Sequence, residues 1–167
     1  IGTPASSSLI ASLKIENRLL TLGKEGFLIL TTTISGKKCI VISANADTGL
    51  LYGTFHFIRL IQTNQQIRNL SIQSAPTIKI RILNHWDNLD RTVERGYAGF
   101  SLWDWHKLPE YIDTRYIDYA RANASVGING TVLTNVNANA QALTAPYLKK
   151  VAALADVFRP YGIRVYL

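Results

Sequence analysis

Two short polar segments hold the residues of this sequence that are best suited to chemistry. Asn84 to Asn88 reads Asn-His-Trp-Asp-Asn, and Asn135 to Asn139 reads Asn-Val-Asn-Ala-Asn. Amides and carboxylates can hydrogen-bond sugar hydroxyls, and an indole face can pack against the C–H face of a sugar ring. The two segments therefore indicate carbohydrate recognition. The alternative for both is local capping of turns by Asn and Asp side chains.

Three carboxylates lie in or near the first segment, at Asp87, Asp90 and Glu94. Two of them could serve as an acid pair in hydrolysis. However, Arg91 and Arg95 lie among them, and local ion pairing is the simpler explanation of such a charge pattern. We therefore do not assign these carboxylates as a catalytic pair.

Nucleotide and metal chemistry have little support in the sequence. The segment Gly96-Tyr97-Ala98-Gly99 lacks the spacing of a dinucleotide- or phosphate-binding loop. His56, His85 and His106 do not have the spacing of metal ligands, and His56 lies within an apolar helical pattern that favours a structural role. We expect neither a metal nor another cofactor.

The second half of the sequence alternates predicted strands and helices, and this order predicts a parallel sheet with right-handed crossovers. It fits either a doubly wound sheet or the beginning of a (β/α)₈ barrel. In both architectures functional side chains lie beyond the C-terminal ends of the strands, where the two polar segments fall. The predicted elements are a strand at Ile78–Leu83, a helix at Tyr111–Ala124, a strand at Gly130–Thr134, a helix from about Thr144 to Pro160, and a strand at Ile163–Leu167.

Apolar spacing predicts which faces of these two helices are buried. The first should bury Tyr116, Ala120 and Ala124, with Ile117 beside them. The second tolerates Pro146 in its first turn and should end at Pro160 and Gly162. Its predicted stripe consists of Leu148, Val151, Ala152, Ala155 and Phe158.

The first half of the sequence reads as an α+β domain. Strands are predicted at Phe27–Ile34 and Lys38–Ala44, joined through Ser35-Gly36-Lys37 as a hairpin. A helix should follow with Asp47 or Thr48 as its N-cap, and a third strand should run from Ile67 to Gln73. The face of the helix predicted to be buried consists of Leu51, Phe55 and Ile58, broadened by Leu50, Phe57 and Ile61.

Pro76 and the change of pattern after it predict a domain boundary. We expect residues 1–76 to be the C-terminal part of an N-terminal α/β domain, and residues 77–167 to be the incomplete start of a second domain.

The composition narrows the possible partners. The chain has 167 residues and a formal net charge of +7, but its basic residues are scattered and do not interleave with aromatic ones. We therefore expect a mildly basic surface and no nucleic-acid partner. No segment is long and apolar enough to span a membrane, and no membrane partner is expected. Cys39 is the only cysteine, so no internal disulfide can form.

Two features predict that the chain is an internal fragment. It contains no Met, and the segment Ile163–Leu167 reads as a strand that ends with the sequence. We also see no signal-peptide pattern at Ile1-Gly2-Thr3-Pro4.

Three segments resemble the α-glucuronidases of glycoside hydrolase family 67. The longest runs from Arg81 to Asp90 and continues through Val93–Gly99; the others are Ile128–Ala138 and Thr48–Phe57. The resemblance covers essentially the whole chain. It implies an N-terminal α/β domain followed by the first strands of a (β/α)₈ barrel.

The resemblance also implies an activity: inverting removal of glucuronic acid or its 4-O-methyl ether from xylo-oligosaccharides derived from glucuronoxylan. In that family the catalytic carboxylates come from later barrel strands, beyond Leu167. What carries over here is a substrate-binding wall of Trp86 with Val136 opposite, and polar contacts from Asn135 and Asn137. His85 and Asp87, which flank Trp86, complete the predicted substrate-binding set. We further expect that the full-length enzyme could form a homodimer. The segment Phe100–Trp105 is given no role.

Three other functions stay open at this point. A β-hexosaminidase-like hydrolase also joins a small α/β domain to a barrel, and an Asp-Glu catalytic pair downstream would favour it. A non-catalytic carbohydrate-binding module would be favoured by a native chain that stops at Leu167. Nucleic-acid binding depends only on the charge, and it would require steep salt dependence.

Overall fold

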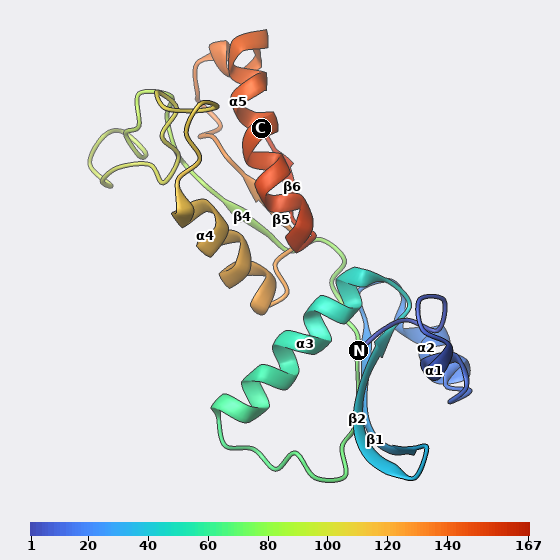
Figure 1. The fold of residues 1–167 in the computed structure, drawn as a ribbon. Helices are drawn as coiled ribbons and strands as arrows, with labels where there is room; N and C mark the ends of the chain where they lie inside the picture. Colours follow the sequence, from blue (N-terminus) through green and yellow to red (C-terminus); the bar gives the residue numbers. More distant parts are fainter. The chain divides into compact units, whose positions relative to one another are not determined.

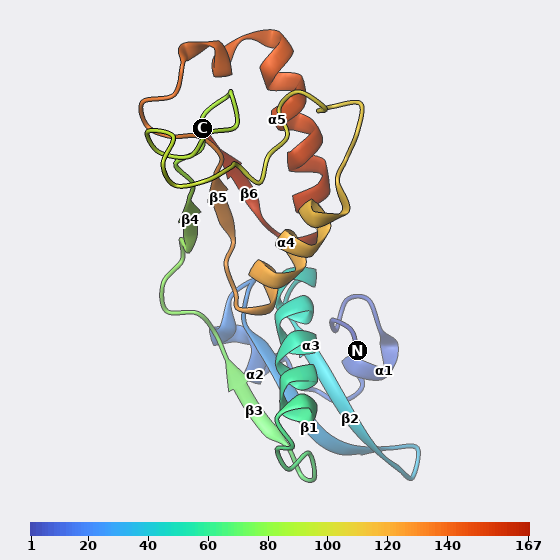
Figure 2. The same ribbon diagram turned by 90° about the vertical axis from the view of Figure 1, so that its left-hand side faces the viewer.

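The computed structural model describes residues 1–167, the whole sequence (Figures 1 and 2). Its residues group into two units, Ile1–Lys79 with Ser125–Gly127, and Ile80–Ala124 with Ile128–Leu167. None of its helices has the length and apolarity needed to cross a membrane. The helices are α1 (Ser8–Ala11), α2 (Glu16–Leu19), α3 (Asp47–Gln62), α4 (Thr114–Ser125) and α5 (Ala145–Phe158). The strands are β1 (Phe27–Ile34), β2 (Lys37–Ala44), β3 (Ser71–Ser74), β4 (Ile82–Asn84), β5 (Gly130–Val132) and β6 (Arg164–Tyr166), and 3₁₀ turns occupy Leu20–Leu22, Ala140–Leu143 and Arg159–Tyr161.

The predicted hairpin of the first unit is confirmed. β1 and β2 pair antiparallel from Phe27 opposite Ala44 to Ile34 opposite Lys37. Ser35 and Gly36 make the two-residue turn with φ of 49° and 77°, and two left-handed residues are what a type I′ hairpin turn requires.

The third strand of this sheet is shorter than predicted. β3 pairs antiparallel with the other edge of β1, but only over Ser71 to Ser74 rather than from Ile67. Asn69 has a φ of 57°, and a left-handed residue interrupts the extended backbone that a strand needs. The regular ladder therefore begins after it.

Both faces of β1 are covered, which explains its continuous apolar start. Leu28 and Leu30, together with Val41 of β2, belong to a buried cluster with side chains from the α1–α2 region. Successive side chains of a strand point to opposite faces, so Phe27 lies on the other face of β1 from Leu28. The centroid of its ring is 5.3 Å from that of the His56 ring in α3. The remaining members of the cluster are Ile10, Ile15, Leu19 and Leu22.

The buried face of α3 differs from the prediction. Its buried residues are Gly49, Tyr52 and Gly53, while Ile58 and Ile61 of the predicted face are exposed. Glycine has no side chain to add to an apolar pattern, so the pattern did not identify this face. The lack of a side chain lets the helix backbone approach a sheet closely. The N-cap was also predicted wrongly: it is Ala46, which has extended backbone and no side-chain cap bond.

The predicted parallel sheet of the second unit is confirmed, in the order β4–β5–β6. Figure 2 shows α4 and α5 on one face of this sheet. The strand predicted from Ile78 begins only at Ile82, which pairs with Gly130, the first residue of β5. Ile78 and Ile80 precede this paired region and are exposed, so the prediction that they form a buried strand is wrong.

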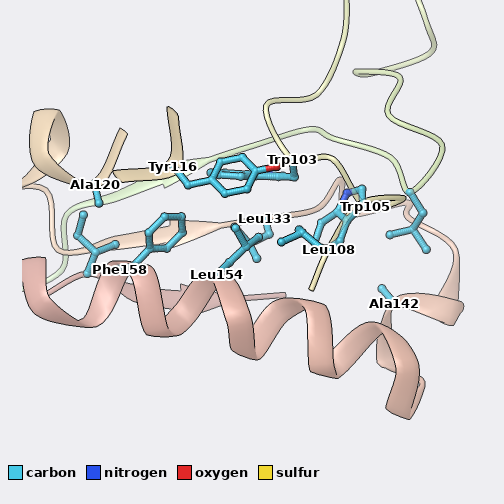
Figure 3. Close-up of a cluster of buried hydrophobic side chains, with 11 residues drawn as sticks. Trp103, Trp105, Leu108, Tyr116, Ala120, Leu133, Ala142, Leu154 and Phe158 are labelled. Carbon is cyan, nitrogen blue, oxygen red and sulfur yellow. The ribbon is translucent and has the colours of Figure 1, made fainter. Parts of the chain in front are cut away.

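The core of this unit lies between the helices and the sheet. Figure 3 shows side chains of α4 and α5 pointing toward Leu133 and toward the Trp residues of the β4–α4 loop. Tyr116, Ala120 and Ala124 of α4 are buried as predicted, whereas Ile117 is exposed. The fully buried residues of this core are Trp103, Leu108, Ala120, Leu133, Leu154 and Phe158.

The predicted stripe of α5 is only partly right. Phe158 is buried and Val151 packs against the core, but Leu148 and Ala152 are exposed. The stripe missed Leu154, which is fully buried. The predicted end of the helix is confirmed: α5 stops at Phe158, and Gly162 has a left-handed φ of 69°.

We predict that Gly49→Ala destabilises the chain more than Gly53→Ala. A Cβ at Gly49 would lie 2.4 Å from the carbonyl oxygen of Gly26, whereas a Cβ at Gly53 would meet side-chain atoms of Ile42 and Phe27 at 2.8 Å or more. Overpacking costs about 1–3 kcal/mol, which exceeds the roughly 1 kcal/mol that alanine gains over glycine in a helix. Urea unfolding measures both variants, with Gln62→Ala at the exposed end of α3 as the control. Equal or increased stability of Gly49→Ala would contradict the observed packing.

We also predict that His56 makes the stability of the chain depend on pH. Burial and then the charge of Arg59 lower the pKa of His56 below its ordinary value of 6.5. The unfolded chain therefore takes up a proton near pH 6.5 that the folded chain does not, so stability falls as pH falls through this range. The Tm difference between about pH 7.5 and pH 5 should be smaller in His56→Gln than in the parent chain. An unchanged difference would show that His56 does not contribute.

Candidate functional site

The carboxyl ends of β4 and β5 lie side by side, as a parallel pair requires. The pairing continues past the strands: the His85 N–H donates to the Val132 carbonyl at 3.1 Å, and the Asn135 N–H donates to the Asp87 carbonyl at 2.8 Å. These two bonds hold the segments after both strands together. The two polar segments that the sequence singled out are therefore brought to one place.

Three of the six predicted site residues present their side chains to solvent here. Trp86 is 45% exposed, Val136 is 76% exposed, and Asn137 is also exposed. They offer an aromatic face, an aliphatic group and an amide from two adjacent strand ends. Such a set can pack against an apolar ring face and hydrogen-bond a hydroxyl.

Asp87 is one of the predicted residues that the structure places inside the protein. It is 3% exposed. The hydroxyl of Ser101 donates to Asp87 Oδ2 at 2.5 Å, and Asp87 Oδ1 lies 3.6 Å from His85 Nδ1. The carboxylate is therefore engaged in holding the β4–α4 loop to the end of β4.

Asn135 is the second interior residue, at 8% exposed. Its Oδ1 accepts the N–H of Asn137 at 3.0 Å, and its carbonyl accepts the N–H of Ala138 at 2.9 Å. These bonds make a turn capped by Asn, the alternative that the sequence left open for this segment. The turn leaves Val136 at its exposed tip.

His85 is partly buried and faces the helices. Its Nε2 lies 2.8 Å from the hydroxyl of Tyr119 in α4, and this hydroxyl lies 2.9 Å from Thr131 Oγ1 in β5. Burial is the largest influence on Tyr119 and raises the pKa of its hydroxyl above 10.0, although the hydrogen bond with Thr131 opposes this. The His85 ring also packs 5.1 Å from that of Trp103.

The β4–α4 loop folds back on the site through its own backbone. Asp87 bridges Val93 and Thr92 bridges Phe100, and the Glu94 N–H donates to the Trp86 carbonyl at 2.8 Å. The backbone on both sides of Trp86 is thus fixed.

The loop carboxylates do not form the acid pair that was considered. Asp90 Oδ1 accepts from the backbone N–H and hydroxyl of Thr92, and these hydrogen bonds lower the pKa of Asp90. Arg91 does form an ion pair, but its partner is Asp104, at 3.1 Å, so the predicted pairing with a neighbouring carboxylate is wrong for this residue. These contacts stabilise the loop.

Three residues of this site were missed by the sequence analysis. The segment Phe100–Trp105 was given no role, yet Ser101 binds Asp87 and Trp103 is fully buried beside His85. The close spacing of aromatic residues in Trp103-Asp104-Trp105 was an available signal of burial. Tyr119 lies one turn after Tyr116 in α4, so it could have been placed near the buried face.

Known proteins resemble this chain over most of its length. A model of the glycosyl hydrolase family 67 N-terminus matches residues 1–57, and a model of the glycosyl hydrolase family 67 middle domain matches residues 60–167. The probable alpha-glucuronidase A of Neosartorya fischeri is 40% identical over 128 residues, which is 77% of this chain and 15% of that protein. The alpha-glucuronidase A of Emericella nidulans is 38% identical over 140 residues, which is 81% of this chain and 16% of that protein. The probable alpha-glucuronidase A of Aspergillus oryzae is 34% identical over 169 residues, which is 96% of this chain and 19% of that protein.

Two solved structures share the fold at low sequence identity. CpGH84B superposes with a TM-score of 0.60 at 16% identity, over 99% of this chain and 27% of that one. A GH138 enzyme targeting pectin rhamnogalacturonan II has a TM-score of 0.53 at 19% identity, over 85% of this chain and 18% of that one. The two family models together match residues 1–57 and 60–167, and the chain belongs to glycosyl hydrolase family 67.

Proposed function

We propose that the chain is part of a longer α-glucuronidase, called here the full-length enzyme. The enzyme would remove glucuronic acid or its 4-O-methyl ether from xylo-oligosaccharides by inverting hydrolysis. The family membership and the names of the curated relatives support this activity. The chain spans less than a fifth of the length of those relatives, so most of the enzyme would lie outside it. The family match does not favour a β-hexosaminidase-like hydrolase or a carbohydrate-binding module.

The second unit would be the beginning of a (β/α)₈ barrel. The strand order β4–β5–β6 follows the chain, and α4 and α5 cover the same face (Figure 2). Successive right-handed crossovers in one direction give this arrangement in a barrel, whereas a doubly wound sheet reverses direction at a switch point. One half of a doubly wound sheet has the same arrangement, so the preference for the barrel rests on the resemblance to family 67.

We place the start of this barrel domain at residue 77. The division between the two units at Lys79 and Ile80 supports a boundary close to Pro76. The family models instead meet between residues 57 and 60, within α3. We prefer the later boundary because α3 and β3 both pack with β1 in the first unit.

Trp86 and Val136 would form the wall of the glucuronic acid pocket. The observation that carries this proposal is the exposed indole at the end of β4, held beside the exposed tip of the β5 loop. Asn137 would hydrogen-bond the sugar. His85, Asp87 and Asn135 would act mainly by fixing the two loops, because their polar atoms are bonded within the protein.

The catalytic carboxylates would come from later barrel strands. Inversion requires an acid and a base roughly 6.5–9.5 Å apart on opposite sides of the scissile bond. The carboxylate nearest this wall, Asp87, is buried and bonded to Ser101, so it is not free to protonate a leaving group. We therefore assign the chain to binding and not to proton transfer.

We predict that Trp86→Ala in the full-length enzyme weakens transition-state binding by about 2–4 kcal/mol, or roughly 30- to 900-fold in kcat/KM. The half-exposed indole contributes little to folding, so the Tm should change little. Steady-state kinetics on a glucuronoxylo-oligosaccharide and thermal unfolding measure both quantities. Trp103→Leu is the matched control: Trp103 is fully buried, so its loss should lower the Tm. An unchanged kcat/KM in Trp86→Ala, or a fall in Tm as large as that of the control, would show that Trp86 is structural.

A second prediction concerns the 167-residue chain alone. It should release no glucuronic acid from aldobiouronic acid or longer glucuronoxylan oligosaccharides, because the acid and base would be absent. Product analysis against a buffer blank measures this, with the full-length enzyme as positive control. Release well above the blank would place the catalytic groups within these residues.

A further inference from the structure

A continuous set of polar contacts runs beneath Trp86. It begins at Thr131 in β5, passes through the Tyr119 hydroxyl to His85 Nε2, and continues from His85 Nδ1 to Asp87. It ends at Ser101, whose hydroxyl donates to Asp87 and whose Oγ accepts the Trp103 N–H at 3.0 Å. The contacts join a strand, a helix, the end of β4 and the following loop.

The direction of these bonds follows from the groups at each end. The Asp87 carboxylate accepts only, so the His85 nitrogen that faces it at 3.6 Å is best protonated. The other ring nitrogen, Nε2, then has a free lone pair and accepts from Tyr119. Tyr119 in turn accepts from Thr131 Oγ1. Asp87 therefore favours the Nδ1–H tautomer of His85, and Tyr119 holds the other ring nitrogen by donating to it.

We propose that Tyr119 is a positioning residue for the Trp86 wall, acting through His85; this inference rests on the proposed function. His85 and Asp87 are the two neighbours of Trp86 in the chain, and both are fixed by the contacts described above. The Trp86 side chain itself is half-exposed, so packing covers only part of it. Its orientation must then come from the backbone, which the two flanking residues control.

Loss of the Tyr119 hydroxyl should affect the Trp86 wall specifically, because this hydroxyl contacts His85 as well as Thr131. Tyr119→Phe would remove the donor to His85 Nε2 and the partner of Thr131 Oγ1, at a part-buried place. The ring would then be free to rotate or to change tautomer. Trp86 would shift with it, and a displacement of about 1 Å is enough to weaken substrate orientation.

Tyr116→Phe is the matched control for Tyr119→Phe. Tyr116 also lies in α4, and its buried hydroxyl accepts a backbone N–H, that of Asp104, at 2.8 Å. Both substitutions remove one hydrogen-bonded phenol hydroxyl from the same helix. Only Tyr119 contacts His85 by a hydrogen bond.

The test is a double-mutant cycle in the full-length enzyme, with crystal structures of the substrate-free single variants. Tyr119→Phe should lower kcat/KM by about tenfold, mainly through KM, while its Tm matches that of Tyr116→Phe. In a Trp86→Ala background the same substitution should cost less than about twofold, because residues that act as a unit are not additive. The crystal structure of Tyr119→Phe should show His85 and Trp86 displaced, and that of Tyr116→Phe should not.

Equal losses from Tyr119→Phe with and without the Trp86 indole would overturn the proposal, and so would an unmoved Trp86 in the crystal structure. The structural comparison needs no substrate. If the parent enzyme does not cleave glucuronoxylo-oligosaccharides, the proposed function is wrong, while the displacement of Trp86 still decides whether Tyr119 positions it.

Discussion

The candidate site depends on the parallel pairing of β4 with β5. Because the strands are parallel, their carboxyl ends meet at one edge, and the bond from the Asn135 N–H to the Asp87 carbonyl extends the pairing into the loops. Residues far apart in the sequence are thereby held next to each other. Trp86 and Val136 can form one surface only because this register is fixed.

The interior beneath that edge is divided between apolar packing and polar contacts. Trp103 is fully buried, with ring centroids of His85, Tyr116, Tyr119 and Phe158 within 5.7 Å of its own. Buried polar groups are costly unless they are hydrogen-bonded, and Asp87 and Tyr119 both meet this condition. Trp86, Val136 and Asn137 are exposed at the strand ends above this packed base. Backbone that is already held by packing and hydrogen bonds has less conformational freedom to lose when a ligand binds.

The spacing of apolar and turn residues predicted most helices and strands correctly. The buried faces and side-chain contacts that were mispredicted depend on segments far apart in the sequence. The β1–β2 hairpin and the Tyr116–Ala120–Ala124 stripe depend on neighbouring residues, so spacing and turn chemistry were sufficient. The buried face of α3 depends on Gly49 and Gly53 meeting a sheet, which an apolar pattern does not register. In the site, the polar side chains of Asp87 and Asn135 led to the prediction that both bind substrate. Only the fold shows that their side-chain oxygens already accept hydrogen bonds, from Ser101 and Asn137 respectively.

We propose that this chain supplies the wall of a glucuronic acid pocket. A crystal structure of the full-length enzyme with bound 4-O-methylglucuronic acid tests it most directly. We expect the sugar ring to lie against the Trp86 indole with Val136 on its other side, and no carboxylate of residues 1–167 to contact the anomeric carbon. A sugar bound elsewhere, with Trp86 covered by protein, would contradict it.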